Sequence, residues 1–197
     1  VQTASSKKAL PIKTSLKALK HNWPWAVIIF INFIYWLGMQ TRNQVTIYFF
    51  KYNMHAAWLT SIMLGLQMAA LITVAITPWC SKKFGKRNTM LTGMLTAIAG
   101  QFVMYLGSKT LNVGIIIAAN IIVNLGTGLV SGLIAVMLAD AVDYGEWRNG
   151  VRAEGIVTSF SSFSAKFGMG IGGAITGWIL NWGGYVANHT QSASALN

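Results

Sequence analysis

The chain has 197 residues, of which 54% are hydrophobic and only 10% are charged. About a quarter of the residues of a soluble domain are charged, so this composition excludes an ordinary soluble protein and predicts a chain surrounded by lipid. The net charge of +11 could suit nucleic acid, but the lysines and arginines lie between long apolar runs rather than on one polar basic face. We therefore expect a lipid bilayer, and no nucleic acid, as a partner.

The chain divides into a polar basic segment, an apolar body and a short tail. Residues 1–22 lack the apolar core of a signal peptide and are predicted to be a cytoplasmic linker. Residues 23–188 are predicted to form a bundle of five membrane spans, and residues 189–197 an external tail. Each span needs about 20 mainly apolar residues and must be helical, because unpaired backbone is prohibitive in lipid. The predicted fold class is an all-α integral membrane protein, with spans at about residues 25–50, 59–79, 89–106, 113–138 and 156–182.

The basic residues predict the orientation of these spans. The N-terminal segment, the connection "SKKFGKR" at 81–87 and the acidic segment 140–155 together carry eleven of the fifteen lysines and arginines. If five helices zigzag, these three places lie on one side, and an excess of positive charge marks the cytoplasmic side. The chain then ends on the outside.

The first span contains the polar run "QTRNQ", Gln40 to Gln44. Five consecutive residues at 100° each surround a helix, so they cannot all face one cavity. Either the helix is unwound here, as in transporter binding sites, or the run is wetted near the outer surface. Arg42 could bind a ligand or extend its side chain to water.

Lys166 lies close to the centre of the fifth predicted span, on one helical face with Ser159 and Ser162. An unpaired lysine at that depth costs about 2.5 to 3.5 kcal/mol, so it should face a watery cavity or a partner. No predicted span carries a carboxylate. A lysine that pairs only with backbone carbonyls is the structural alternative.

Single amides and small residues inside the spans predict helix contacts. Gln67, Gln101, Asn120 and Asn124 are more often links between helices than ligand contacts. The motifs "GLVSG" at 128–132, "GMGIG" at 168–172 and "GAITG" at 173–177 place small residues four apart, which allows two helix backbones to approach closely.

All four carboxylates of the chain lie in the acidic segment. Asp140, Asp143 and Glu146 recur every three residues and would share a face of a continuing helix, with Arg152 and Glu154 close behind. Such a network could be a conformational switch, with ion pairs present in one state and absent in another. It could equally be a static, solvated turn, since surface ion pairs contribute little.

At these residues the chain resembles a known family. The stretch "LADAVDYGEWRNGVRAEGIVTSFSSFSAKFGMGIGG" is similar to the loop and penultimate helix of the glycoside-pentoside-hexuronide:cation symporters, the branch of the major facilitator superfamily that includes melibiose permease. The run "ADAVDYGE", the "RAE" at 152–154 and Lys166, twelve residues after Glu154, carry the resemblance. "NLGTG" at 124–128, "RNQVTIYFF" at 42–50 and "KKFGKR" support it.

The resemblance implies a transporter of twelve helices, of which these five look like helices seven to eleven of its C-terminal half. It implies a bacterial inner membrane, a sugar substrate and a coupling cation, Na⁺ or H⁺, bound mainly by carboxylates of an N-terminal half that this chain lacks. No other cofactor is expected. The implied sugar cavity includes Lys166, Asn124, Ser131, Arg42, Asn43 and Tyr48, and the implied cytoplasmic gate includes Asp140, Asp143, Glu146, Arg152 and Glu154. Ser131 stands where the melibiose-type pattern has a tryptophan, so melibiose is not assigned.

We expect the chain to be the C-terminal part of a secondary active sugar symporter that works by alternating access. The alternative is a small integral membrane subunit that packs against a partner protein. An enzyme is not expected, because glycoside hydrolysis needs two carboxyls across a substrate rather than in a row on one helix. The sequence shows neither metal ligands nor catalytic residues.

Overall fold

The computed structural model describes residue 16 and residues 19–185, and all regular elements within this part of the chain are helices. The predicted linker 1–22 and tail 189–197 therefore lie almost wholly outside the described residues. The predicted all-α membrane class is confirmed. In chain order the elements are α2 (Trp23–Tyr48), η1 (Phe49–Asn53), α3 (Trp58–Leu66), α4 (Ala69–Phe84), α5 (Lys86–Thr110), α6 (Val113–Asn149) and α7 (Glu154–Trp182).

Four helical segments of the described chain are long and apolar enough to cross a membrane, namely Trp23–Asn53, Trp58–Phe84, Lys86–Thr110 and Val113–Asn149. The helix α7 has 29 residues but is not among them, because serines, glycines and Lys166 dilute its apolar residues. The five predicted ranges each lie within the helical segments found here. Their membrane boundaries, and the fifth span itself, stay predictions.

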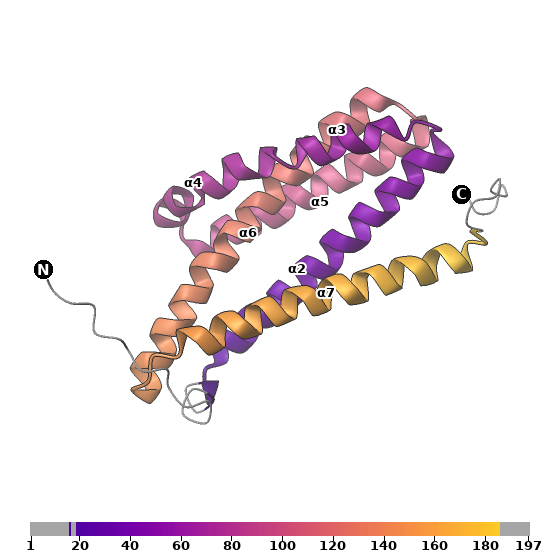
Figure 1. Cartoon of the computed structure of the whole chain (residues 1–197). Coiled ribbons are helices and arrows are strands. Elements are labelled where there is room, and N and C mark those ends of the chain that lie inside the picture. Colours follow the sequence, from indigo (N-terminus) through magenta and orange to yellow (C-terminus); the bar gives the residue numbers. More distant parts are fainter. Residues whose placement is uncertain (1–15, 17–18, 186–197) are drawn as a thin grey trace, which may run out of the picture.

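The helix α6 is the central element of the bundle, and it packs against α4, α5 and α2 (Figure 1). A side chain on Gly126 would come within 2.5 Å of the Ala97 backbone nitrogen and 2.7 Å of the Gly93 carbonyl of α5. Six residues later, Gly132 lies against the side chain of Thr77 of α4. Small residues on two faces of α6 therefore let both neighbouring backbones approach, which is how helices associate where lipid removes the hydrophobic driving force.

The helix α5 meets α6 along a glycine seam. Gly93, Gly100 and Gly107 recur every seven residues, and all three are buried. A seven-residue repeat keeps one face of a helix turned toward its neighbour when two helices cross at a shallow angle. Added side chains at Gly100 and Gly107 would contact Val123 and Ile115 of α6 within 3.0 Å.

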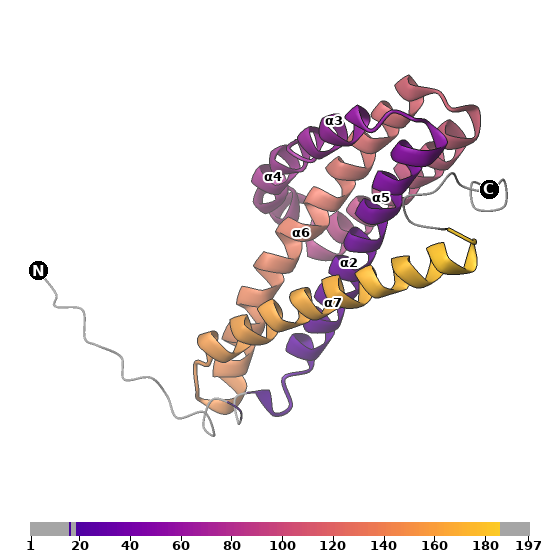
Figure 2. The ribbon, with the colours of Figure 1, turned by 45° about the vertical axis from the view of Figure 1, so that its right-hand side comes forward.

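The second close pair is α2 with α7, which overlap over part of their length in both views and separate toward their C-terminal ends (Figures 1 and 2). Gly168 and Gly172 of the predicted "GMGIG" contact lie against the backbone of α2, where added side chains would meet the carbonyls of Phe33 and Leu37 at 2.6 Å. In "GAITG", Gly173 lies near Gln44, but Gly177 has open space around it. Only the first of these two motifs contacts a neighbouring backbone at both of its end glycines.

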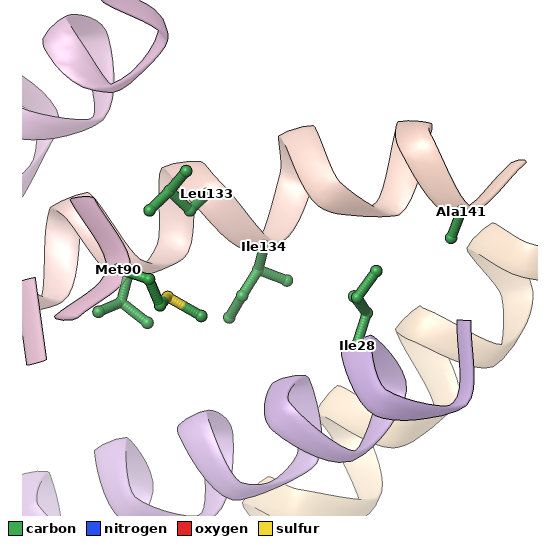
Figure 3. Close-up of a cluster of buried hydrophobic side chains, with 6 residues drawn as sticks. Ile28, Met90, Leu133, Ile134 and Ala141 are labelled. Carbon is green, nitrogen blue, oxygen red and sulfur yellow. The ribbon is translucent and has the colours of Figure 1, made fainter. Parts of the chain in front are cut away.

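Two apolar clusters connect the helices near opposite ends of α2. One joins α2, α5 and α6 and comprises Ile28, Met90, Val130, Leu133, Ile134 and Ala141, most of which Figure 3 labels. The other joins η1, which follows α2, to α3 and α6 through Phe50, Leu59, Met63 and Ile116. At the first end the buried Asn22 side chain donates a hydrogen bond to the Ala141 carbonyl at 2.8 Å, which fixes the start of α2 to α6.

The contact at Gly126 gives a test of this architecture. Gly126→Ala should destabilise the folded chain in detergent by about 1 to 3 kcal/mol, because the added methyl group must displace backbone atoms of α5. The control is Gly170→Ala on α7, where nothing lies within 4 Å, so the substitution should be neutral or slightly stabilising through helix propensity. Denaturant or thermal unfolding of both variants measures the difference. Equal stability of the two variants would contradict the close contact.

Candidate functional site

The polar run of α2 is a regular helix in the structure, since α2 continues without interruption from Trp23 to Tyr48. Of the two alternatives for Gln40 to Gln44, the unwound helix is therefore wrong. The residues of the run instead point to different neighbours, as the helical period requires. Thr41 donates to the carbonyls of Leu37 and Gly172 at 2.9 and 3.2 Å and so faces α7, whereas Asn43 accepts a hydrogen bond from Gln67 at 3.3 Å.

The Arg42 side chain faces neither of these neighbours and lines a groove between α2, α5 and α6. Its Nε and Nη1 atoms are buried and have no hydrogen-bond partner. Scales of membrane insertion assign about 2.5 to 3.5 kcal/mol to a central arginine, so this arrangement is costly. The structure does not place Arg42 on the helix face that carries Asn43.

The irregular helix lies in the second span, where Gln67 and Met68 separate α3 from α4. The backbone nitrogens of both residues bond three residues back, to Leu64 and Gly65, which is a tight turn within a helix. The Leu66 carbonyl next to this break accepts a hydrogen bond from Asn124 of α6 at 3.4 Å. The sequence analysis missed the break, although Gly65 and the polar Gln67 in mid-span were signals for it.

Asn124 is fully buried, and its amide also donates to the Asn120 side chain at 2.6 Å. The Asn124 side-chain oxygen is buried without a hydrogen-bond partner. A buried polar atom of this kind calls for an explanation, and a ligand hydroxyl is one. The predicted cavity residues Asn43 and Asn124 thus both contact the break, through Gln67 and Leu66 respectively.

Ser131 and Tyr48 make contacts within the chain. The Ser131 hydroxyl donates a hydrogen bond to the Gly128 carbonyl at 3.0 Å. Tyr48 stacks on Tyr52 and meets Tyr185 edge to face, with ring centres 5.2 Å apart in the second pair. These contacts hold both side chains in place, and their predicted role toward a sugar remains a prediction.

Lys166 lies on the exposed side of α7, together with Ser159 and Ser162 as the helical period predicts. The opposite side of α7 is the one that packs on α2 and holds the buried Val157, Ser164, Gly168, Gly172 and Thr176. Within the described residues Lys166 makes no ion pair, and the chain's four carboxylates all lie at 140–154. The structure does not bring Lys166 into contact with the other predicted cavity residues.

A buried asparagine that the sequence analysis missed joins α7 to α2. Asn32 donates to the Ser161 carbonyl at 2.9 Å and to the Ser164 hydroxyl at 2.7 Å. A single asparagine in the apolar run "FINFIYW" was the available signal. These hydrogen bonds hold one side of α7 against α2. They therefore fix the rotation of α7 about its axis, which leaves Lys166 on the opposite, exposed side.

The acidic segment is mainly helical, because α6 continues to Asn149 and ends at Gly150 in a left-handed conformation with φ 67°. The predicted single network of five residues divides into two. Arg152 binds Asp143 at 2.8 Å and Glu146 at 2.7 Å, with Glu154 at 3.7 Å. Asp140 instead pairs with Lys86 at the start of α5. The hydrogen bonds that the Arg152 guanidinium donates to Glu146 and Asp143 raise its pKa, so it remains charged.

No group of three or more His, Cys, Asp or Glu side chains that could hold a metal ion occurs among the described residues. What the arrangement offers chemically is hydrogen bonding and charge. The described chain carries one unpaired cation on an open polar face of α7, amide groups at a helix break, and exposed ion pairs at one end of α6.

The tyrosines at the ends of α2 and α7 allow a test of local geometry. Tyr185 donates a hydrogen bond to Tyr52 at 2.9 Å, and this bond, with burial, raises the pKa of Tyr185 to about 12. Tyr52→Phe removes the acceptor, so Tyr185 should ionise at a lower pH, nearer the ordinary value of about 10. Alkaline titration of tyrosinate absorbance, with Tyr185→Phe to identify its contribution, measures the change. The same titration in both backgrounds would show that the bond is absent.

Comparison with known proteins places the whole chain in one group. The family model described as MFS/sugar transport protein matches residues 1–197. The chain is 74% identical over its full length to the isoprimeverose transporter of Lactiplantibacillus pentosus, of which it covers 41%. It is 26% identical over 94% of its length to the glucuronide carrier protein homolog of Escherichia coli K12 (41% of that protein). It is 30% identical over 86% of its length to the uncharacterized symporter YnaJ of Bacillus subtilis 168 (37% of that protein). The chain thus spans about two fifths of the length of these relatives.

Proposed function

We propose that this chain, which belongs to the family of MFS/sugar transport proteins, is the C-terminal part of a secondary active transporter that carries a sugar together with a cation. The family predicted from the acidic segment and Lys166 is confirmed. Four apolar helices of membrane length make the chain part of a multi-pass membrane protein. The identity of 74% over all 197 residues to an isoprimeverose transporter is the observation that carries the proposal.

The first candidate substrate is isoprimeverose, because that is the sugar named for the relative with 74% identity. Sugar hydroxyls both donate and accept hydrogen bonds. The buried, unpartnered oxygen of Asn124 can accept one. Asn43 and Ser131 are further candidates for sugar contacts, and Gln67, which the structure brings to Asn43, joins them.

In the proposed mechanism Lys166 acts from the open face of α7. Its ammonium group can donate to sugar oxygens or pair with carboxylates of a facing half. The substrate site of such transporters lies between two halves near the middle of the membrane. A site that includes an exposed cation on one half is therefore complete only when the other half covers it. The coupling cation, Na⁺ or H⁺, is expected to bind to acids that lie outside this chain.

The proposed gate is the Arg152 network. One guanidinium binds two carboxylates of α6 directly, and a third, Glu154, starts α7. The network therefore fixes the turn between α6 and α7. A change in the angle between these helices would alter these contacts, which is the requirement for a switch. Asp140, paired with Lys86, connects α6 to the start of α5 and belongs to a separate contact.

We place the protein in the bacterial inner membrane and assign it no enzymatic activity, since the relatives described above are named as a transporter, a carrier and a symporter. The alternative of a small membrane subunit finds no support in these names. The sugar, the cation and the direction of transport are parts of the proposal.

The role of Lys166 is testable in the full-length protein. Lys166→Ala should abolish accumulation of isoprimeverose while leaving membrane insertion intact, because the only charged group on the open face of α7 is removed. Phe163→Leu, three residues earlier on the same exposed side of α7, is the control and should retain uptake. Uptake of labelled sugar, normalised to protein in the membrane, is the measurement. Normal accumulation by Lys166→Ala would refute the role.

The gate makes a different prediction. Asp143→Asn removes a 2.8 Å ion pair of Arg152 and should shift the balance between inward-open and outward-open states. Labelling of single introduced cysteines from each side of the membrane measures this balance. Trp147→Phe, an exposed neighbour on α6, is the control. Unchanged labelling in Asp143→Asn would favour a static turn.

A further inference from the structure

A pocket of about 520 Å³ lies at the end of the bundle where α2 begins and α6 ends (Figure 1). Two hydrogen bonds hold its walls together. The buried Asn22 side chain donates to the Ala141 carbonyl at 2.8 Å, and the Asn149 side chain donates to a second carbonyl, that of Lys20, at 3.3 Å. The residues that precede α2 are thus fixed to the end of α6, and the pocket between them is part of the fold.

The polar groups that line this pocket are mainly hydrogen-bond donors. They are the imidazole of His21, the indole N–H groups of Trp23 and Trp25, the phenol of Tyr144 and the guanidinium of Arg148. The Nε1 atom of Trp25 is buried and has no hydrogen-bond partner within the described residues. A buried donor of this kind calls for an acceptor. The pocket therefore favours a ligand that offers oxygen atoms as acceptors.

The charge of the pocket is positive, because no carboxylate of the chain is left to pair with Arg148. The chain has four carboxylates, and the ion pairs described above engage each of them with Arg152 or Lys86. Arg148 itself takes part in no ion pair in the described part of the chain. Lys20, next to the pocket in sequence, adds a second exposed cation. An anion is therefore the ligand that the charges favour.

The position of the pocket favours a lipid headgroup over a soluble anion. Trp23 begins the membrane-length segment Trp23–Asn53 and is 75% exposed, and tryptophan side chains prefer the headgroup zone of a bilayer. The pocket thus lies where the phosphates of lipids lie, on the side that the basic residues predict to be cytoplasmic. Basic pockets between transmembrane helices on that side are a known form of binding site for anionic headgroups.

We propose that the pocket between the start of α2 and the end of α6 binds the phosphodiester headgroup of an anionic membrane lipid. Arg148 supplies the charge, and the Trp25 indole supplies a hydrogen-bond donor. The site is separate from the residues proposed to contact sugar and from the Arg152 network. A bound headgroup would add a further link between α2 and α6 at the membrane surface.

Native mass spectrometry of the purified full-length protein tests the charge. The probe is phosphatidylglycerol, and phosphatidylcholine with the same acyl chains is the comparison. The unsubstituted protein should retain more phosphatidylglycerol, and Arg148→Gln should lower the bound amount of this lipid about fivefold, without changing that of phosphatidylcholine. The matched control is Arg87→Gln, which removes an exposed cation at the start of α5, outside the pocket, and should retain the lipid.

Three outcomes of this measurement would overturn the proposal. The first is equal retention of the two lipids by the unsubstituted protein. The second is an unchanged amount of phosphatidylglycerol in Arg148→Gln. The third is an equal loss in Arg148→Gln and Arg87→Gln, because the lipid would then respond to the overall charge of this side of the protein rather than to the pocket.

A second variant tests the buried donor. Trp25→Phe keeps an aromatic ring but removes the indole N–H, so bound phosphatidylglycerol should fall about threefold. Trp58→Phe is the control, since Trp58 is 63% exposed at the start of α3 and does not line the pocket. It should bind as much phosphatidylglycerol as the unsubstituted protein. No change in Trp25→Phe would contradict the assigned hydrogen bond.

Thermal unfolding distinguishes a lipid from a soluble anion. Phosphatidylglycerol should raise the Tm of the full-length protein in detergent, and the rise should be smaller in Arg148→Gln. Inorganic phosphate and glycerol 3-phosphate should not raise it, because neither has acyl chains that hold the headgroup at the membrane surface. Equal stabilisation by inorganic phosphate would overturn the assignment to a lipid. None of these measurements uses sugar uptake, so their failure would leave the transport proposal standing.

Discussion

The bundle depends on close contact between helix backbones at glycine. In a bilayer the lipid chains are as apolar as leucine, so burying apolar side chains gives little reason for helices to associate. Gly93 and Gly126 bring α5 onto one face of α6, Gly132 brings α4 onto another, and Gly168 and Gly172 bring α7 onto α2. Van der Waals contact and hydrogen bonds such as that from Asn32 to Ser164 then hold the helices together.

The sequence predicted the all-α fold, the family and the shared face of Ser159, Ser162 and Lys166, because hydropathy and the helical period are local properties. It did not predict which neighbour a polar residue meets. The run at Gln40 to Gln44 was interpreted as a possible break in the helix. In the structure the helix stays regular, because the side chains of the run contact different neighbouring helices. Asp140 was grouped with Arg152 because the two are close in sequence, whereas its partner Lys86 lies 54 residues away.

The true irregularity, at Gln67 and Met68, was missed for a related reason. Gly65 and Gln67 were local signals, but a single amide that merely faces another helix has the same local pattern as one that stands at a break. The break becomes understandable only with α6 in place, because Asn124 supplies a donor to the Leu66 carbonyl beside it. A polar group from a distant helix thus compensates an irregular backbone in a setting where water cannot.

The length of α6 has a mechanical consequence. Its 37 residues extend about 55 Å, well beyond the roughly 30 Å of hydrocarbon that a bilayer presents. The end that bears Asp140, Asp143 and Glu146 is therefore a rigid extension of a rod whose middle is clamped between α4 and α5. Such a rod is a lever: a tilt of about 10° around its midpoint displaces the far end sideways by about 5 Å. A displacement of that size is larger than the distance that separates the charged atoms of an ion pair. A small rearrangement among closely packed glycines inside the membrane can therefore form or break complete ion pairs at the membrane surface.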